Sequence, residues 1–178
     1  SYPDRNDYDL IIVPSSIVAH ETEIAAIIKM TQMGMPTVAI GPFATNFSQA
    51  YLKAGASVIA GEPEMYFACE DLDLDFIKKR PSLLQVEQTK SLDDLPYPAW
   101  DITFEELNTI HRFLAVSGTT IPIAATRGCP YSCSYYCTYP LQQGVKVRKR
   151  SPQKIVQEMI YWKEKLGVSN FIFRDPVF

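Results

Sequence analysis

The chain has 178 residues, of which 47% are hydrophobic and 21% charged, and its formal net charge is -3. These values are ordinary for a globular protein, and the acidic balance argues against a general nucleic-acid binder. No apolar run reaches the roughly 18 residues that a membrane-spanning helix needs, and residues 1–7 lack the features of a secretory signal. We therefore expect a cytoplasmic protein with no nucleic-acid partner and no membrane span.

The N-terminal region alternates between short apolar runs and longer amphipathic segments. The runs at 9–13, Thr37–Ile40 and Ser57–Ala60 predict strands that are buried on both faces of a parallel sheet. Helices are expected between them, at about 20–33 and 47–53, each ended by a glycine. The order strand, helix, strand, helix, strand indicates an α/β fold.

Small residues follow these three predicted strands. They are Ser15, Ser16, Gly41 and Gly61. Ligands of parallel sheets bind at the carboxyl ends of the strands, where small side chains let a large flat molecule approach the backbone. The alternative is that these residues simply end the strands.

The middle of the chain is rich in charge and proline. A short helix is expected at 64–70, with Cys69 as a small core residue. Residues 78–119 predict a linker, because its prolines push the preceding residues out of the helical region. The predicted organisation is a first domain at 1–77, this linker, and a second domain at 120–178.

The second domain begins with a predicted strand at 121–126. A helix is expected to follow, with Ser151 as N-cap, Pro152 at its first position and Gly167 at its end. Its apolar stripe would consist of Ile155, Val156, Met159, Ile160 and Leu166. A strand at 170–174 completes one βαβ module. Such a module cannot bury its apolar faces alone, so we expect a fragment or cover borrowed from elsewhere.

Three of the four cysteines, Cys129, Cys133 and Cys137, lie on one loop with the spacing C-x3-C-x3-C. Three thiolates favour a [4Fe–4S] cluster with one iron open to another ligand such as S-adenosylmethionine. A zinc site with a remote fourth ligand and a disulfide with one cysteine left over remain as alternatives.

The cysteine loop and its surroundings resemble the radical S-adenosylmethionine superfamily. More narrowly, they resemble members with an N-terminal cobalamin-binding domain, a group that includes the anaerobic magnesium-protoporphyrin monomethyl ester oxidative cyclases and cobalamin-dependent radical methyltransferases. The residues that carry the resemblance lie at 61–64, 92–101, 127–133, 136–140, 147–148, 150–152 and 175–178. The loop has one residue more than the superfamily's C-x3-C-x2-C, and the cobalamin-ligating pattern Asp-x-His-x-x-Gly is absent from the sequence.

The resemblance implies a partial Rossmann-like cobalamin-binding domain followed by the first βαβ unit of a partial TIM barrel. Cys129, Cys133 and Cys137 would hold the cluster. Tyr136 and Asp175 would contact S-adenosylmethionine, at its adenine and at its amino group respectively. A cobalamin pocket would be lined by Ser15, Ser16, Gly41 and Gly61.

The implied function is reductive cleavage of S-adenosylmethionine for radical chemistry, either methyl transfer or oxidative cyclisation. It would act on a small-molecule substrate and draw electrons from a donor such as flavodoxin or ferredoxin. This piece alone is expected to be inactive. The alternative is a cobalamin- or nucleotide-binding module whose loop holds structural zinc or an electron-transfer iron–sulfur cluster.

Overall fold

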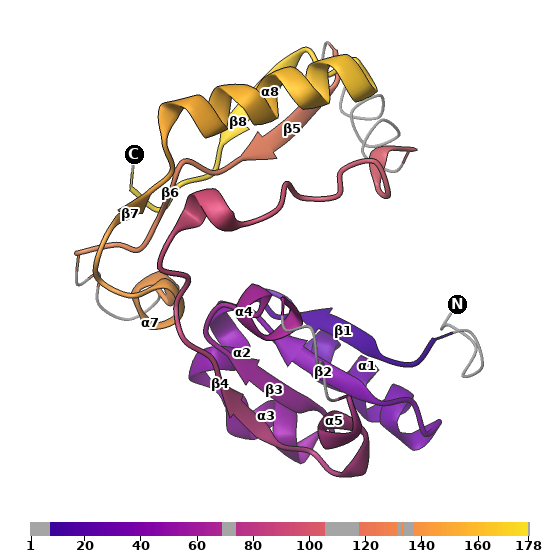
Figure 1. Cartoon of the computed structure of the whole chain (residues 1–178). Helices are drawn as coiled ribbons and strands as arrows, with labels where there is room; N and C mark the ends of the chain where they lie inside the picture. Colours follow the sequence, from indigo (N-terminus) through magenta and orange to yellow (C-terminus); the bar gives the residue numbers. More distant parts are fainter. Residues whose placement is uncertain (1–7, 69–73, 106–117, 132, 134–136, 178) are drawn as a thin grey trace. The chain divides into compact units, whose positions relative to one another are not determined.

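The structure is a computed structural model that describes residues 8–68, 74–105, 118–131, 133 and 137–177. The chain forms two compact units (Figure 1). Unit 1 comprises Ser1–Thr89 and Pro130–Val145, and unit 2 comprises Lys90–Cys129 and Lys146–Phe178. Each unit therefore draws on two segments of the chain. The domain boundaries expected from the sequence stay a prediction.

Unit 1 contains a parallel sheet with the strand order β1-β2-β3-β4. The strands are β1 (Ile11–Pro14), β2 (Thr37–Ile40), β3 (Ser57–Ala60) and β4 (Leu83–Gln85). The first three were predicted from their apolar runs and are confirmed. β4 falls inside the predicted linker; it has three residues, two of them exposed, and so lacks a long apolar run.

Helices cover one face of this sheet (Figure 1). They are α1 (His20–Gln32), α2 (Pro42–Asn46) and α3 (Ser48–Lys53). Their buried side chains form one core cluster with alternate residues of the strands. The helices contribute Ile27, Phe43 and Tyr51, and the strands contribute Ala39, Val58 and Ala60. The helix predicted at 47–53 is α3. A further short helix, α2, precedes it because a proline suits the first helical position.

The other face carries a second apolar cluster. It joins Val38 and Ile59 of the strands to α4 (Glu64–Phe67) and α5 (Asp75–Lys79). The helix predicted at 64–70 is thus α4, whereas Cys69 lies outside the described residues. Cover on both faces explains why β2 and β3 are continuous apolar runs rather than alternating ones.

Unit 2 contains one βαβ module. β5 (Thr120–Ile123) pairs in parallel with β8 (Asn170–Phe173), and α8 (Pro152–Leu166) lies along this pair (Figure 1). A short antiparallel pair, β6 (Thr126–Arg127) and β7 (Arg148–Lys149), adjoins it. The predicted module is present. Among the described residues the parallel sheet of unit 2 has two strands, so a barrel is not shown.

The two ends of α8 are as predicted. The Ser151 side chain accepts a hydrogen bond from the Lys154 backbone N–H, and Pro152 occupies the first helical position. Gly167 ends the helix in the left-handed conformation, with φ of 65°. These residues satisfy backbone groups that would otherwise lack partners at the helix ends.

The predicted apolar stripe of α8 is only partly right. Val156 and Ile160 are about half exposed, at 51% and 49%, whereas Glu158 and Trp162 are buried. Trp162 packs with Ile121 of β5 and Val168 in the core of the unit. The Trp162 ring on α8 therefore faces the core. The Glu158 carboxylate can be buried on the same face because Arg150 neutralises its charge.

Two further short elements complete the described chain. They are the 3-10 helix η1 (Leu92–Asp94) in unit 2 and α7 (Tyr139–Gln143) in unit 1. In the part of the chain that is described, no helix has the length and apolar character required to cross a membrane.

Candidate functional site

The carboxyl ends of β1, β2 and β3 bring the predicted small residues to one edge of unit 1. Ser15 is buried, and its hydroxyl accepts a hydrogen bond of 2.7 Å from the Ala44 backbone N–H. Ser16 donates to Oε1 of Glu23 from its backbone N–H at 3.0 Å and from its hydroxyl at 3.1 Å. Both serines therefore hold neighbouring helices in place.

Glu23 extends this network to the third helix. Its Oε2 accepts a hydrogen bond of 2.8 Å from the Tyr51 hydroxyl. Burial of the phenol, reinforced by the adjacent Glu23 carboxylate, raises the pKa of Tyr51. The tyrosine is therefore a neutral donor that ties α3 to α1.

Gly41 and Gly61 have positive φ angles, 97° and 105°, which favour glycine. A Cβ atom on Gly41 would lie 3.2 Å from the Ser15 hydroxyl, and one on Gly61 would lie 2.6 Å from the Val86 carbonyl oxygen. Thr45 joins the two positions, since its hydroxyl donates to the Gly41 carbonyl and accepts from the Gly61 N–H. The space beside these glycines is therefore occupied by the protein's own backbone and side chains.

The structure divides the three cysteines of the loop between the two units. Cys129 is buried in unit 2, whereas the exposed Cys133 and the half-buried Cys137 belong to unit 1. All three are free thiols. Tyr136, the predicted adenine contact, lies outside the described residues. Within the ranges that the structure describes, no group of three His, Cys, Asp or Glu residues is arranged to hold a metal ion.

Asp175, just beyond β8, fixes the end of β5. Its Oδ1 accepts hydrogen bonds from the backbone N–H groups of Ala125, at 2.8 Å, and of Thr126. The Thr126 hydroxyl in turn donates to the Val177 carbonyl at 2.7 Å. The second carboxylate oxygen, Oδ2, is buried without a hydrogen-bond partner. The Oδ1 atom thus holds the backbone in place, and the Oδ2 atom is a buried acceptor without a donor.

A pocket of about 390 Å³ adjoins this strand end. Ala125, Thr126 and Val177 line one part of it, and Lys149 and Arg150 line another. The residues that Asp175 holds in place therefore form the wall of a cavity with a basic side. Asp175 itself is not among the residues that line this cavity.

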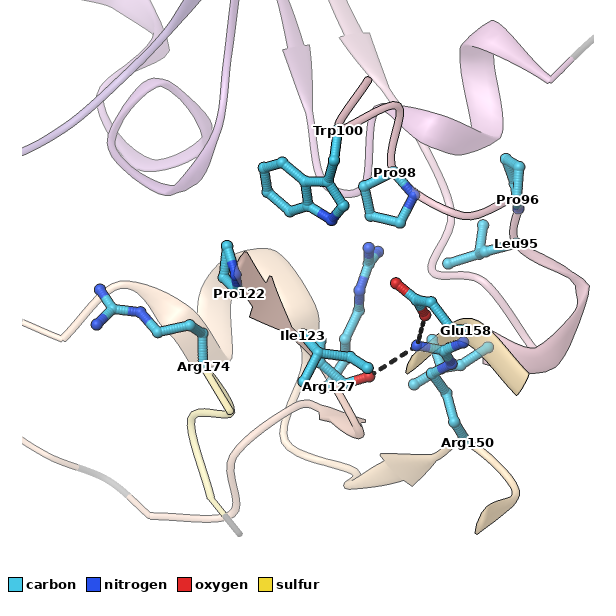
Figure 2. A pocket seen from close by; sticks show the side chains of 12 residues that line it. Leu95, Pro96, Pro98, Trp100, Pro122, Ile123, Arg127, Arg150, Glu158 and Arg174 are labelled. Carbon is cyan, nitrogen blue, oxygen red and sulfur yellow. Dashed lines mark hydrogen bonds and ion pairs between the residues drawn. The ribbon is translucent and has the colours of Figure 1, made fainter. Parts of the chain in front are cut away.

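A second pocket of unit 2, of about 270 Å³, contains a buried ion pair (Figure 2). Arg150 Nη1 lies 2.5 Å from Glu158 Oε2 and donates at 3.0 Å to the Ala124 carbonyl. The two side chains are 12% and 2% exposed. Sequence reasoning missed this pair, although Glu158 stands one turn before Trp162 on α8 and so shares its face.

No known protein-family profile matches the chain. Bacteriochlorophyllide d C-12(1)-methyltransferase of Chlorobaculum tepidum is 34% identical over 122 residues, which are 67% of this chain and 25% of that protein. Cytidylyl-2-hydroxyethylphosphonate methyltransferase of Streptomyces wedmorensis is 28% identical over 47% of this chain and 16% of its own length. An uncharacterized methyltransferase of Synechocystis is 23% identical over 94% of this chain and 29% of its own. The chain thus spans less than a third of each relative.

These findings correct the function predicted from the sequence. The identification of a radical S-adenosylmethionine enzyme is contradicted, because the relatives are named as methyltransferases and the described residues contain no group able to hold a metal cluster. The iron–sulfur cluster, cobalamin and the external electron donor lose their support with it. The C-x3-C-x3-C spacing shows only that the three cysteines are near one another in sequence. In the folded chain Cys129 is buried, whereas Cys133 is exposed.

Proposed function

We propose that this chain is part of a methyltransferase that uses S-adenosylmethionine as methyl donor and a small molecule as acceptor. The observation that carries the proposal is that each of the four similar proteins compared is named as a methyltransferase. Two of those names specify small-molecule acceptors, bacteriochlorophyllide d and cytidylyl-2-hydroxyethylphosphonate. For this chain we propose a small-molecule acceptor, but neither of these two compounds in particular.

The proposed reaction is a direct displacement. A nucleophilic atom of the acceptor bonds to the methyl carbon, the bond between that carbon and the sulfonium sulfur breaks, and S-adenosylhomocysteine leaves as a neutral thioether. Any proton displaced from the nucleophile passes to solvent or to a nearby base. The protein's main contribution to such a reaction is to hold the two reactants in line and close together.

Asp175 is the proposed contact for the ammonium group of the donor. Hydrogen bonds from the N–H groups of Ala125 and Thr126 fix its carboxylate, so little rotational freedom remains to be lost on binding. Its Oδ2 has no hydrogen-bond partner in the structure and can accept from the ammonium. Lys149, on the basic side of the adjoining pocket, is the proposed partner of the donor's carboxylate. Tyr136 stays a predicted contact of the adenine.

Equilibrium dialysis of the purified chain against radiolabelled S-adenosylmethionine tests this proposal. Asp175→Asn keeps a carbonyl oxygen for the two backbone N–H groups but removes the charge. The matched control is Asp94→Asn, at an exposed carboxylate. We expect saturable binding that Asp175→Asn weakens by about 10- to 100-fold, in line with a hydrogen bond between charged groups, and that Asp94→Asn leaves unchanged. No binding by the unaltered chain, or equal binding by both variants, would overturn the assignment.

A further inference from the structure

We propose that Arg150 is a positioning residue of the donor site. It holds the link between β5 and β6 in the shape that presents the Asp175 carboxylate to the methyl donor. This inference rests on the proposed function, since it gives Arg150 a task in the binding of S-adenosylmethionine. Arg150 acts through Asp175 and does not itself contact the donor. All the residues concerned belong to unit 2.

The link between β5 and β6 is held from two sides. On one side Arg150 donates to two successive carbonyl groups, from Nη1 to that of Ala124 at 3.0 Å and from its backbone N–H to that of Ala125 at 2.8 Å. On the other side Asp175 Oδ1 accepts from the N–H groups of Ala125, at 2.8 Å, and of Thr126. Ala125 is therefore bonded to Asp175 through its N–H and to Arg150 through its carbonyl, so a change in the position of Arg150 moves the backbone that holds Asp175.

The Arg150 side chain is in turn held by α8. Its Nη1 lies 2.5 Å from Oε2 of Glu158, and the two side chains are 12% and 2% exposed. Figure 2 shows the guanidinium group of Arg150 with dashed contacts both to Glu158 and to a backbone carbonyl oxygen. A guanidinium group presents several N–H donors in one rigid plane, so it can serve a carboxylate and a carbonyl together, whereas the ammonium group of lysine is a flexible point charge. The ion pair thus connects α8 to the end of β5.

The charge of Arg150 favours positioning over direct attraction of the donor. The Glu158 carboxylate neutralises the guanidinium, and a buried pair of this kind is strongly destabilised when either partner leaves it. Arg150 also lines both cavities of unit 2, including the one whose wall contains Ala125 and Thr126. A displacement of about 1 Å in a positioning group can cost a site up to about 100-fold, so a looser link at Ala125 should be measurable as weaker donor binding.

A double-mutant cycle tests whether Arg150 acts through Asp175. Arg150→Lys keeps a positive charge opposite Glu158 but replaces the rigid guanidinium plane. By equilibrium dialysis of the purified chain against radiolabelled S-adenosylmethionine, we expect this variant to bind about tenfold more weakly than the unaltered chain. In the Asp175→Asn background the same change should alter binding by no more than about twofold, because the group through which it acts has been removed. If Arg150 contacted the donor directly, the two losses would instead multiply.

Two further variants separate positioning from a general loss of stability. Gly167→Ala changes the other end of α8, where a new Cβ meets no atom within 4 Å, and should bind the donor as the unaltered chain does. Arg150→Met/Glu158→Leu removes both charges, so no unpaired charge is left buried. It also removes the hydrogen bond to Ala124 and should bind about tenfold more weakly. This variant serves as the test if Arg150→Lys fails to fold by circular dichroism.

The outcomes distinguish this inference from the proposed function. Unchanged binding in the Arg150 variants, losses that multiply with that of Asp175→Asn, or an equal loss in Gly167→Ala would overturn the positioning role and leave Asp175 as the donor contact. No binding by the unaltered chain, or no loss in Asp175→Asn, would overturn the proposed function and this inference with it.

Discussion

Unit 1 and unit 2 are built from the same parallel βαβ arrangement, but they differ in how it is covered. In unit 1 the strand β3 is buried along its whole length between two apolar clusters. In unit 2 the strand β8 has three exposed residues out of four, and Ile172 and Phe173 are 51% and 41% exposed. Apolar strands gain most of their stability from the layers placed over them, so the two sheets are unequal in stabilisation.

The polar groups of the two units differ in a corresponding way. At the strand ends of unit 1, Ser15, Ser16, Glu23 and Tyr51 bond to one another or to the local backbone. In unit 2, the Trp100 indole, the Arg150 Nε–H and the Asp175 Oδ2 are buried without partners. In the part of the chain that the structure describes, these polar side chains of unit 1 therefore serve architecture, whereas unit 2 contains several buried polar atoms without a hydrogen-bond partner.

Loss of the buried ion pair should have the largest effect on unit 2. Glu158→Gln removes the charge that compensates Arg150, and we expect a loss of about 3–5 kcal/mol in the free energy of unfolding. Urea titration followed by tryptophan fluorescence measures it. The double variant Arg150→Met/Glu158→Leu removes both charges and should recover most of the loss; if it is as unstable as Glu158→Gln, the pair is not the cause.

An added methyl group at the strand end of unit 1 should have the next largest effect. Gly61→Ala places a Cβ 2.6 Å from the Val86 carbonyl oxygen at a φ of 105°, and we expect a loss of about 2–4 kcal/mol. Gly167→Ala in unit 2 is the matched control, since its φ is 65° and no atom lies within 4 Å of the new Cβ. That variant should cost only about 1 kcal/mol by urea titration. Equal losses would show that backbone conformation alone matters.

Removal of the N-cap of α8 should have a smaller effect. Ser151→Ala deletes the acceptor of the Lys154 N–H, and we expect a loss of about 1 kcal/mol. Ser151→Asp keeps an acceptor at this position and should restore the stability of α8. Chemical denaturation by circular dichroism compares the two, and a loss shared by both variants would contradict the capping role.

The smallest predicted effect is a pH dependence at the surface of unit 2. The hydrogen bond of 2.8 Å from Lys165 lowers the pKa of Asp101, and the same contact raises the pKa of Lys165. The contribution of Asp101 is therefore present above its unfolded pKa and is lost as the pH falls through the lower folded value. That of Lys165 is present below its unfolded pKa and is lost as the pH rises through the higher folded value. Asp101→Asn should flatten both limbs of a plot of Tm against pH; an unchanged plot would exclude the pair as a contributor.

Continuous apolar runs and helix-end residues were enough to predict much of the fold. Three strands of unit 1 and both ends of α8 follow from local rules that act within a few residues. The inward face of α8 could not be predicted from apolar spacing, because Arg150 stabilises the buried Glu158 there. The strand β4 could not be predicted either, because its pairing with β3 stabilises it. Each depends on a partner that lies outside the element itself.

The candidate site was harder to predict than the fold. Cysteine spacing identifies suitable ligands, but only the folded chain decides whether they meet, and the described cysteines form no metal-binding group. Asp175 was predicted from a resemblance, yet its hydrogen bonds to Ala125 and Thr126 join positions about fifty residues apart. No local pattern contains such information.

We propose that unit 2 contains the binding site for the methyl donor and that the strand ends of unit 1 do not. A ¹H–¹⁵N correlation spectrum of the labelled chain, recorded during titration with S-adenosylmethionine, tests it directly. We predict that the amide signals of Ala125 and Thr126 shift, since both donate to Asp175, while those of Gly41 and Gly61 stay in place. Shifts at Gly41 and Gly61 without shifts at Ala125 and Thr126, or no shifts at all, would contradict the account.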